Sequence, residues 1–374
     1  MINQVPLLSQ ARNPRALIKI NDMTVREVEY LEYVENNFYL SDSFHVKLPL
    51  YNLQEAIDIE YLLSQPAILV ELFVGFPSNP LSYGINDLQS LILGGINNLK
   101  VRVFDSGGYI EFDGFDLSKK FIDNKTTQKY QYQTASNIAI TLAQKEGLTA
   151  VVTPTTQYVG YYYAQDYVQL QNEVTEWDLL VYLAQKEGFQ VFVRGKTLYF
   201  QPKPLTSPDP YLLQASTLEN GQLASFNGTT LTVGRNLNYS RDVIVSIRSW
   251  NAKTGLVHVK LSGKPIRNQQ AAAVAQPIGQ AQVYEYSPPG LTKEQAIILA
   301  RKLLEDITQH ERLLEASLPG DNKLRKDSVI ELKGVSLSAD QTYYPDTITR
   351  TISPGGYTMQ VRAKNHSPQS IVTI

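Results

Sequence analysis

The hexapeptide LAQKEG occurs twice in this chain of 374 residues, at residues 142–147 and again at residues 183–188. In both copies a threonine, Thr134 or Thr175, lies thirteen residues before the closing glycine. A threonine at the start of a helix can accept a hydrogen bond from a free backbone amide, and glycine readily adopts the left-handed conformation that ends a helix. Because an apolar, strand-like run follows each glycine, the sequence predicts two capped helices, each leading into a strand, in a small α/β domain.

The second of these predicted helices carries one of the two tryptophans of the chain. Trp177 shares an apolar helical face with Leu180, so we expect it in the core of the α/β domain and not on a sugar-binding surface. Asp178 places a negative charge at the positive end of the helix dipole. Further along, Gly195 predicts a hairpin turn, and the two prolines after it mark the end of the domain.

The segments on either side of this domain have the patterns of β-strands. In FHVKLPL, residues 44–50, apolar and polar side chains alternate, and AILVELFVGF, residues 67–76, has the composition of a buried strand. Later in the chain, DVIVSIRSW at 242–250 and GLVHVKLSG at 255–263 predict a hairpin, and a capping box opens a helix at Thr292. Short strands separated by polar turns are typical of a barrel or a sandwich, so the chain is predicted to be mainly β with α+β elements.

The composition argues against several classes of protein. The net charge is −2, so no overall basic field favours nucleic acid or an acidic membrane as the main partner. There is no cysteine, which excludes disulfides, thiol catalysis and thiolate metal sites. No run approaches the roughly 20 apolar residues that a membrane-spanning helix needs, so we expect no membrane partner.

The sequence contains no group of residues with the spacing of a catalytic or metal site. The four histidines are scattered, and two of them alternate with apolar neighbours, which predicts the solvent face of a sheet. The acidic segment 105–116 lacks oxygen-bearing side chains at the alternate positions that a calcium loop requires. We therefore predict no catalytic residues, no metal site and no cofactor, and expect that the protein is not an enzyme. The four histidines are His45 and His258, which alternate with apolar neighbours, and His310 and His366.

Tyrosine is abundant, with 23 residues, and it clusters in YVGYYYAQDY, from Tyr158 to Tyr167. Such a cluster can form an aromatic platform for a sugar. Tyrosine is also favoured in strands and at protein interfaces, where it offers apolar area with a polar tip. We favour the second interpretation and keep a glycan-binding or glycan-degrading β-protein as an alternative function.

The order of motifs from about residue 90 to the end of the chain resembles a known family. The motifs are GFDLS at 114–118, TASNIA at 134–139, TEWDLL from residue 175 with a GKTLYF hairpin after it, and PGLTKEQAIILARKLL at 289–304, which leads to LPG and terminal strands. In this order and spacing they are similar to the baseplate hub proteins of contractile phage tails, the late-control D-protein family. That family is related to the base of the VgrG spike of type VI secretion.

The resemblance implies two tube-type antiparallel β-barrel domains in one chain, together with the small α/β domain. On this basis the chain divides into a first tube-type β-domain at residues 1–115, an α/β accessory domain at 116–205 and a second tube-type β-domain at 206–374.

The second β-domain is expected to combine residues 206–262 with residues 320–374. Between these parts we expect an inserted loop at about 263–285 and a helix at 292–310. The helix is expected to pack against the second barrel through Leu299 and Leu303, which lie on its apolar stripe.

Family membership also implies a homotrimer, in which three subunits form a ring of six β-domains that adapts a hexameric tail tube to a trimeric central spike. The implied partners are the tail tube protein, the spike, the baseplate wedge proteins and the tape measure protein, and DNA at most passes through the lumen. The implied location is the baseplate of the virion tail, after assembly in the host cytoplasm. The hub of a non-contractile tail, which uses the same domains, is the alternative within this class.

Overall fold

The structure is a computed structural model that describes residues 13–373 with several gaps. The described part of the chain is mainly β, as the sequence predicts. The residues that lie outside the described part are 1–12, 27, 38, 54–56, 106, 127–129, 131, 157, 160–173, 205, 217–223, 237–242, 252, 265–281, 309–311, 337–338, 366–370 and 374.

The first β-domain is built from the N-terminal strands, which surround one apolar core. Their order in the sheet is β2-β1-β5-β6-β7-β4-β3. In β3 and β4 every second side chain is buried, as expected for strands with one face on a core. A short helix, α1 (Ile59–Ser64), adds Leu62 to this core. The strands are β1 (Arg15–Ile20), β2 (Met23–Val25), β3 (Tyr30–Asn36), β4 (Ser43–Pro49), β5 (Leu69–Gly75), β6 (Gln89–Phe104) and β7 (Gly107–Asp116).

The second β-domain has the same strand order as the first. Its strands follow the order β14-β13-β20-β21-β22-β19-β15. If the seven strands of each domain are matched in the order in which they occur along the chain, so that β13 corresponds to β1 and β22 to β7, this order is the same as that of the first domain. One pairing differs in direction, because β1 and β5 are antiparallel whereas β13 and β20 are parallel. The strands are β13 (Tyr211–Ser216), β14 (Ser225–Phe226), β15 (Thr230–Arg235), β19 (Arg312–Pro319), β20 (Ile330–Lys333), β21 (Thr342–Ser353) and β22 (Gly356–Asn365).

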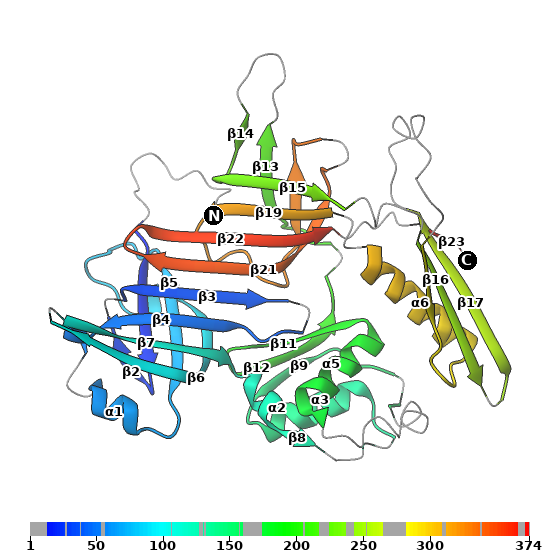
Figure 1. The fold of residues 1–374 in the computed structure, drawn as a ribbon, viewed down its shortest axis with the longest axis horizontal. Helices are drawn as coiled ribbons and strands as arrows, with labels where there is room; N and C mark the ends of the chain where they lie inside the picture. Colours follow the sequence, from blue (N-terminus) through cyan, green and yellow to red (C-terminus); the bar gives the residue numbers. More distant parts are fainter. Residues whose placement is uncertain are drawn as a thin grey trace.

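The two β-domains are joined by a strand pairing between β3 and β21, which we call the joint. This pairing merges the two domains into one sheet of 14 described strands. Figure 1 shows the result as a continuous stack that runs from β15 through β19, β22, β21, β3 and β4 to β7.

The α/β domain follows β7 and contains the two repeated hexapeptides. Its longer helices begin at the predicted caps, where Thr134 accepts a hydrogen bond from the amide of Asn137 and Thr175 accepts one from the amide of Asp178. Gly188 ends α5 in the left-handed conformation, as predicted, with φ of 74°. The elements are α2 (Lys119–Asp123), β8 (Lys125–Thr126), α3 (Ala135–Lys145), β9 (Thr149–Val152), β10 (Val174–Thr175), α5 (Glu176–Glu187), β11 (Phe189–Arg194) and β12 (Thr197–Pro202).

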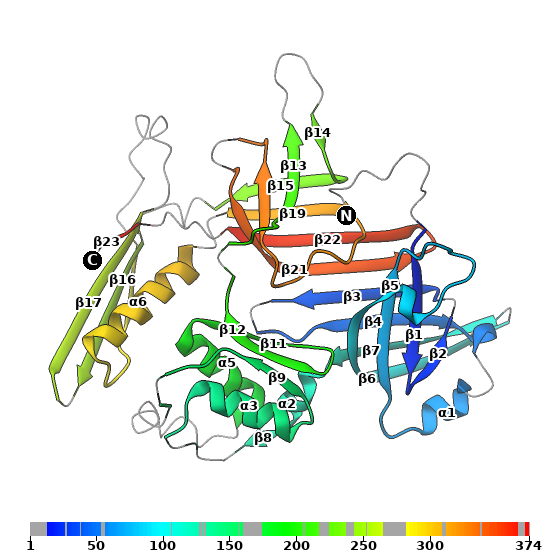
Figure 2. The same ribbon diagram turned by 180° about the vertical axis from the view of Figure 1, so that it is seen from behind.

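A separate unit, which we call the inserted unit, is built mainly from the residues between β15 and β19, and one strand near the end of the chain completes its sheet. It is a four-stranded sheet in the order β18-β16-β17-β23 with helix α6 packed on it. Figure 2 shows it to the side of the two β-domains, with α6 running along β16 and β17. Its elements are β16 (Val243–Asn251), β17 (Gly255–Lys264), β18 (Gln282–Tyr286), α6 (Lys293–Thr308) and β23 (Ile371–Thr373).

The inserted unit corrects two expectations drawn from the sequence. The hairpin of residues 243–264 was expected in the second barrel, but it pairs with β18 and β23 instead. The helix was expected to pack on the barrel through Leu299 and Leu303, but these side chains are part of the cluster formed with β16 and β17. The hairpin and the helix each carry one apolar face, and these neighbours in sequence cover each other.

Candidate functional site: the joint between the two β-domains

The joint pairs six residues of β3 with six residues of β21 in antiparallel register, from Leu31 opposite Ile352 to Asn36 opposite Thr347. The side chains of both strands that face the core are buried along its whole length. Two of these buried side chains are charged. Glu35 and Arg350 occupy positions where the alternation of the strand would otherwise place an apolar core residue.

Glu35 and Arg350 form an ion pair across the joint. The distance between Arg350 Nη1 and Glu35 Oε2 is 2.9 Å, and both side chains are almost completely buried. The remaining guanidinium donors reach backbone oxygens, since Nε donates to Asp321 O at 3.0 Å and Nη2 donates to Leu324 O. Burial alone would raise the pKa of Glu35, but Arg350 and three further cations nearby lower it to about 2. Glu35 is therefore charged at neutral pH and forms its ion pair with Arg350 in the charged state.

A second buried ion pair lies beside the first and joins Asp42, on the loop that follows β3, to Lys326, which lies between β19 and β20. Lys326 Nζ is 2.7 Å from Asp42 Oδ1, and the backbone amide of Lys326 donates to Glu35 Oε1 at 3.1 Å. Asp116, at the end of β7, accepts a hydrogen bond from the amide of Asp42 at 3.4 Å. Burial raises the pKa of Asp42 to about 7. Lys326 acts to lower this pKa, but the neighbouring carboxylates of Asp116 and Glu35 raise it again. Asp42 and Asp116 thus share one lysine in a buried site.

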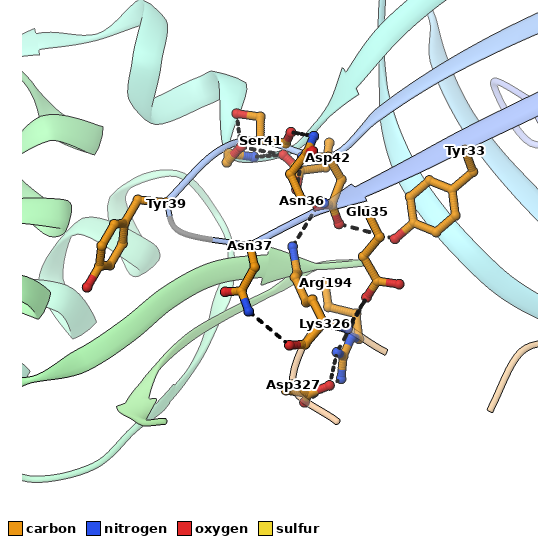
Figure 3. Close-up of polar contacts among 12 residues, drawn as sticks. Tyr33, Glu35, Asn36, Asn37, Tyr39, Ser41, Asp42, Arg194, Lys326 and Asp327 are labelled. Atoms are coloured by element: carbon orange, nitrogen blue, oxygen red, sulfur yellow. Dashed lines mark hydrogen bonds and ion pairs between the residues drawn. The ribbon is translucent and has the colours of Figure 1, made fainter. Parts of the chain in front are cut away.

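The α/β domain contacts the same place through Arg194 on β11. Its guanidinium makes a two-point contact with Asp327, with Nη2 to Oδ1 at 2.8 Å and Nη1 to Oδ2 at 3.3 Å, and Nη2 lies 4.0 Å from Glu35 Oε1. Figure 3 shows Arg194 and Lys326 approaching the carboxylates of Glu35, Asp42 and Asp327 from different parts of the chain. We call these charged residues, together with Asp116 and Arg350, the ionic cluster.

Residues 37–42, between β3 and β4, tie the three domains together around the ionic cluster. Asn37 donates from its side chain to Lys326 O at 3.1 Å and to Pro345 O at 2.9 Å. Trp177 donates from Nε1 to Tyr39 O at 2.8 Å, and Tyr39 donates from its hydroxyl to Phe189 O at 2.9 Å. The loop thus contacts the second β-domain on one side and the α/β domain on the other.

The ionic cluster consists of ion pairs and hydrogen bonds that connect the domains to one another. Its carboxylates accept from arginine, lysine or backbone donors at the distances given above; those of Glu35, Asp42 and Asp116 are buried, whereas that of Asp327 is partly exposed. Within the described ranges, no group of three or more histidine or acidic side chains is arranged to hold a metal ion. In a buried pair of this kind, desolvation of the charges opposes their attraction, so the pair as a whole stabilises the fold less than its short distance suggests, whereas removing one partner alone is costly.

The residues singled out from the sequence are spread over the molecule. Trp177 is buried in the α/β core, as predicted, where its ring lies 6.3 Å from that of Phe121. His45 lies 3.2 Å from Glu111, and the exposed His258 lies 3.1 Å from Ser246, both on outward positions of strands. Tyr158 is exposed, whereas the remainder of its cluster up to Tyr167 lies outside the described residues, apart from Val159. His310 and His366 also lie outside them.

The ionic cluster was missed from the sequence, although a signal for it exists. In YLEYVEN, residues 30–36, Glu35 follows Leu31 and Tyr33 at the inward phase of the strand. In TITRTIS, residues 347–353, Arg350 stands between Ile348 and Ile352 in the same way. A charge at a core-facing position needs a buried partner of opposite sign, so the two patterns together predict a pair.

Comparison with solved structures places this fold among tail proteins. The structure matches the tail protein of Neisseria meningitidis with a TM-score of 0.67 and 12% identity, over 96% of this chain and 99% of the other. It matches the tail protein of prophage MuSo2 from Shewanella oneidensis with a TM-score of 0.64 and 11% identity, over 94% and 98% of the two chains. The chain has the fold of a phage tail protein.

A similar structure outside phages extends this likeness. A component of the type VI secretion system of E. coli, itself described as structurally similar to tail proteins of bacteriophage T4, matches with a TM-score of 0.57 and 11% identity over 96% of this chain and 79% of the other. No family model and no curated protein matches the sequence. None of the helices in the described residues is both long and apolar enough to cross a membrane. The likeness therefore lies in the fold, and it covers nearly the whole chain.

Proposed function

We propose that the protein is a structural hub of a phage-tail-like baseplate, a homotrimer that adapts a hexameric tail tube to a trimeric spike. The observation that carries this proposal is the repeated strand order of the two β-domains within one chain. Closed rings require matching interfaces, and a three-fold assembly presents six similar units only when each chain supplies two. The near-complete overlap with tail proteins of two bacteria supports the same conclusion.

In this proposal the ionic cluster fixes the angle between the two β-domains of one chain. A ring closes only if each domain is rotated by the correct amount relative to the next. In the described part of the chain, the joint with its buried Glu35–Arg350 pair is the strand pairing that connects the two β-domains. The proposed partners are the tail tube protein, the central spike, the baseplate wedge proteins and the tape measure protein. The proposed location is the tail of the virion, after assembly in the host cytoplasm.

A role without catalysis is part of the same proposal. The buried carboxylates of the ionic cluster are occupied by cations, and they face the contact between domains. The hub of a non-contractile tail would use the same architecture, so the proposal covers both tail types.

The test is the mass of the full chain in solution. Sedimentation or mass photometry over a range of concentrations should show a species of three chains of 42.0 kDa each, since assembly of weakly associating subunits depends on concentration. Electron microscopy of that species should show a ring with an open channel. A chain that stays monomeric at the highest concentration, or that hydrolyses cell-wall glycan, would overturn the proposal.

A further inference from the structure

The hairpins β6–β7 and β21–β22 correspond residue by residue. Both turn through two residues, since Phe104 pairs with Gly107 and Ser353 pairs with Gly356. Both also carry a β-bulge seven residues before the last residue of the first strand, at Asn97 and at Asp346. Bulges are specific features of a strand and not random defects, so this agreement fixes the match between β6 and β21 without any sequence similarity.

The strands β3 and β15 correspond in the same way. Leu31 pairs with Val46 on β4, and Leu231 pairs with Ala316 on β19. In turn, Val46 and Ala316 pair with matched positions of β7 and β22. The segment YLEYVEN at 30–36 is therefore the counterpart of TLTVGRN at 230–236, and both end in asparagine.

Within the chain, β3 uses the edge of β21 that becomes free where β20 ends. The last described pairing of β20 is Ile330 with Tyr343, and β3 then pairs with residues 347–352. In the first β-domain, β5 pairs with β6 only as far as Gly95. Among the described strands, none pairs with the same edge of β6 over residues 98–103, and β15 pairs only with β19.

Where one edge of β6 has no described partner, over residues 98–103, the apolar side chains lie on one face of the strand. Val103 is 73% exposed, whereas its counterpart in the joint, Ile352, is 9% exposed. Val101 and Leu99 point to the same face as Val103, because successive side chains alternate along a strand, and these two side chains are partly buried against the core of the first β-domain. On β15, Leu231 and Val233 form a matching apolar pair, and neither is fully buried. Unpaired strand edges with apolar side chains are templates for pairing with another chain.

We propose that β15 of one copy pairs antiparallel with residues 98–103 of β6 in the next copy, in the register that the joint uses within the chain. Carrying the register over places Val233 opposite Val101 and Leu231 opposite Val103. This inference rests on the proposed trimer and names the contact that closes it. Each copy offers one edge of each kind, so the contact is head-to-tail and repeats until the ring closes.

The contact between copies differs from the joint in one respect. The counterpart of Glu35 is Arg235 and the counterpart of Arg350 is Val101, so the buried ion pair of the joint has no equivalent there. The same register places Arg235 opposite Leu99, so the contact between copies depends on strand pairing and on the apolar pairs of Val233 with Val101 and Leu231 with Val103.

The test uses cysteine pairs, because the natural chain has no cysteine and every disulfide formed is an engineered one. Full-length V101C and V233C, mixed in equal amounts and mildly oxidised, should give a covalent dimer of the two different variants. The double variant should give a covalent trimer. The matched control is K100C mixed with V233C, since residue 100 points to the opposite face of the strand.

Each outcome decides a different point. A trimer by mass that forms no V101C–V233C disulfide overturns the strand pairing and leaves the proposed function standing. Equal cross-linking by K100C overturns the register. A chain that remains monomeric and forms no disulfide overturns both the pairing and the proposed function.

Discussion

The buried ion pair of the joint can be tested by replacing Arg350 with methionine. Methionine keeps an unbranched apolar side chain in the core and removes all the guanidinium donors. Glu35 then loses its 2.9 Å partner, and the backbone oxygens of Asp321 and Leu324 lose the guanidinium donors, although Asp321 O still accepts from the hydroxyl of Tyr357. The variant therefore leaves a buried carboxylate without its main counter-charge.

The expected cost is about 3–5 kcal/mol in the free energy of opening the joint, the range found when one partner of a buried ion pair is removed. The double variant Glu35→Gln with Arg350→Met should recover about 2 kcal/mol of this loss, because the amide carries no charge to desolvate. The pKa of Glu35 is lowered from 4.5 to about 2, so the pair stabilises the protein fully above pH 4.5. That contribution is lost as the pH falls towards 2, and the penalty of Arg350→Met should shrink over the same window.

Amide hydrogen exchange of β3 and β21 is the appropriate assay. A chain of several domains does not unfold in one step, whereas exchange reports the opening of a chosen pair of strands. The matched control is Arg362→Met on the neighbouring strand β22, where the arginine is 3.1 Å from Glu315 but mostly exposed. An exposed pair contributes at most ~1 kcal/mol.

Two results would refute the reasoning. If Arg350→Met changed the exchange of β3 and β21 no more than Arg362→Met does, the buried pair would not hold the joint. If the double variant were as damaged as the sum of the two single variants, the two side chains would act independently.

Three further predictions follow from the structure. Burial raises the pKa of Asp42 from 3.8 to about 7, so the contribution of this carboxyl to stability falls as the pH rises through that window; Asp42→Asn should flatten the change in thermal stability between pH 4 and 8, and an unchanged curve would contradict this. Trp177→Ala should cost about 3–5 kcal/mol in chemical unfolding of the α/β domain, and a cost below 1 kcal/mol would place the ring outside the core. Val103→Glu should reduce the trimer population at least tenfold in sedimentation with unchanged thermal unfolding, whereas Leu81→Glu, at an exposed loop position, should leave the trimer intact; equal effects would argue against β6 as an interface.

Local features of the fold were accessible from the sequence because their chemistry is local. Each helix cap needs only a threonine and the amides of the next turn, so Thr134 and Thr175 are sufficient to place α3 and α5. The turn at Gly195 was predictable for the same reason, because the strands that it joins, β11 and β12, are adjacent in the chain.

Partner choice between strands was not accessible in the same way. The hairpin of β16 and β17 alternates as a barrel strand would, and alternation shows which face is buried but not which element covers it. The joint brings together residues of β3 and β21 that are more than 300 positions apart in the sequence. Glu35 and Arg350, for example, are separated by 315 positions. Only the inward phase of these two charges pointed to a contact, and it could not say where.

The placement of the two added domains gives the proposed ring two different rims. The loop of residues 37–42 joins β3 to β4, and the inserted unit takes the corresponding place between β15 and β19. The α/β domain docks on the same loop through Trp177. The turns of the hairpins β6–β7 and β21–β22 lie at the opposite ends of their strands, away from both added domains, as Figure 1 shows. A hub that joins a tube on one side to a spike on the other needs two unlike faces on a single axis. The α/β domain docks at one end of the first β-domain, and the inserted unit follows the equivalent end of the second, so the two faces differ without breaking the match between the β-domains.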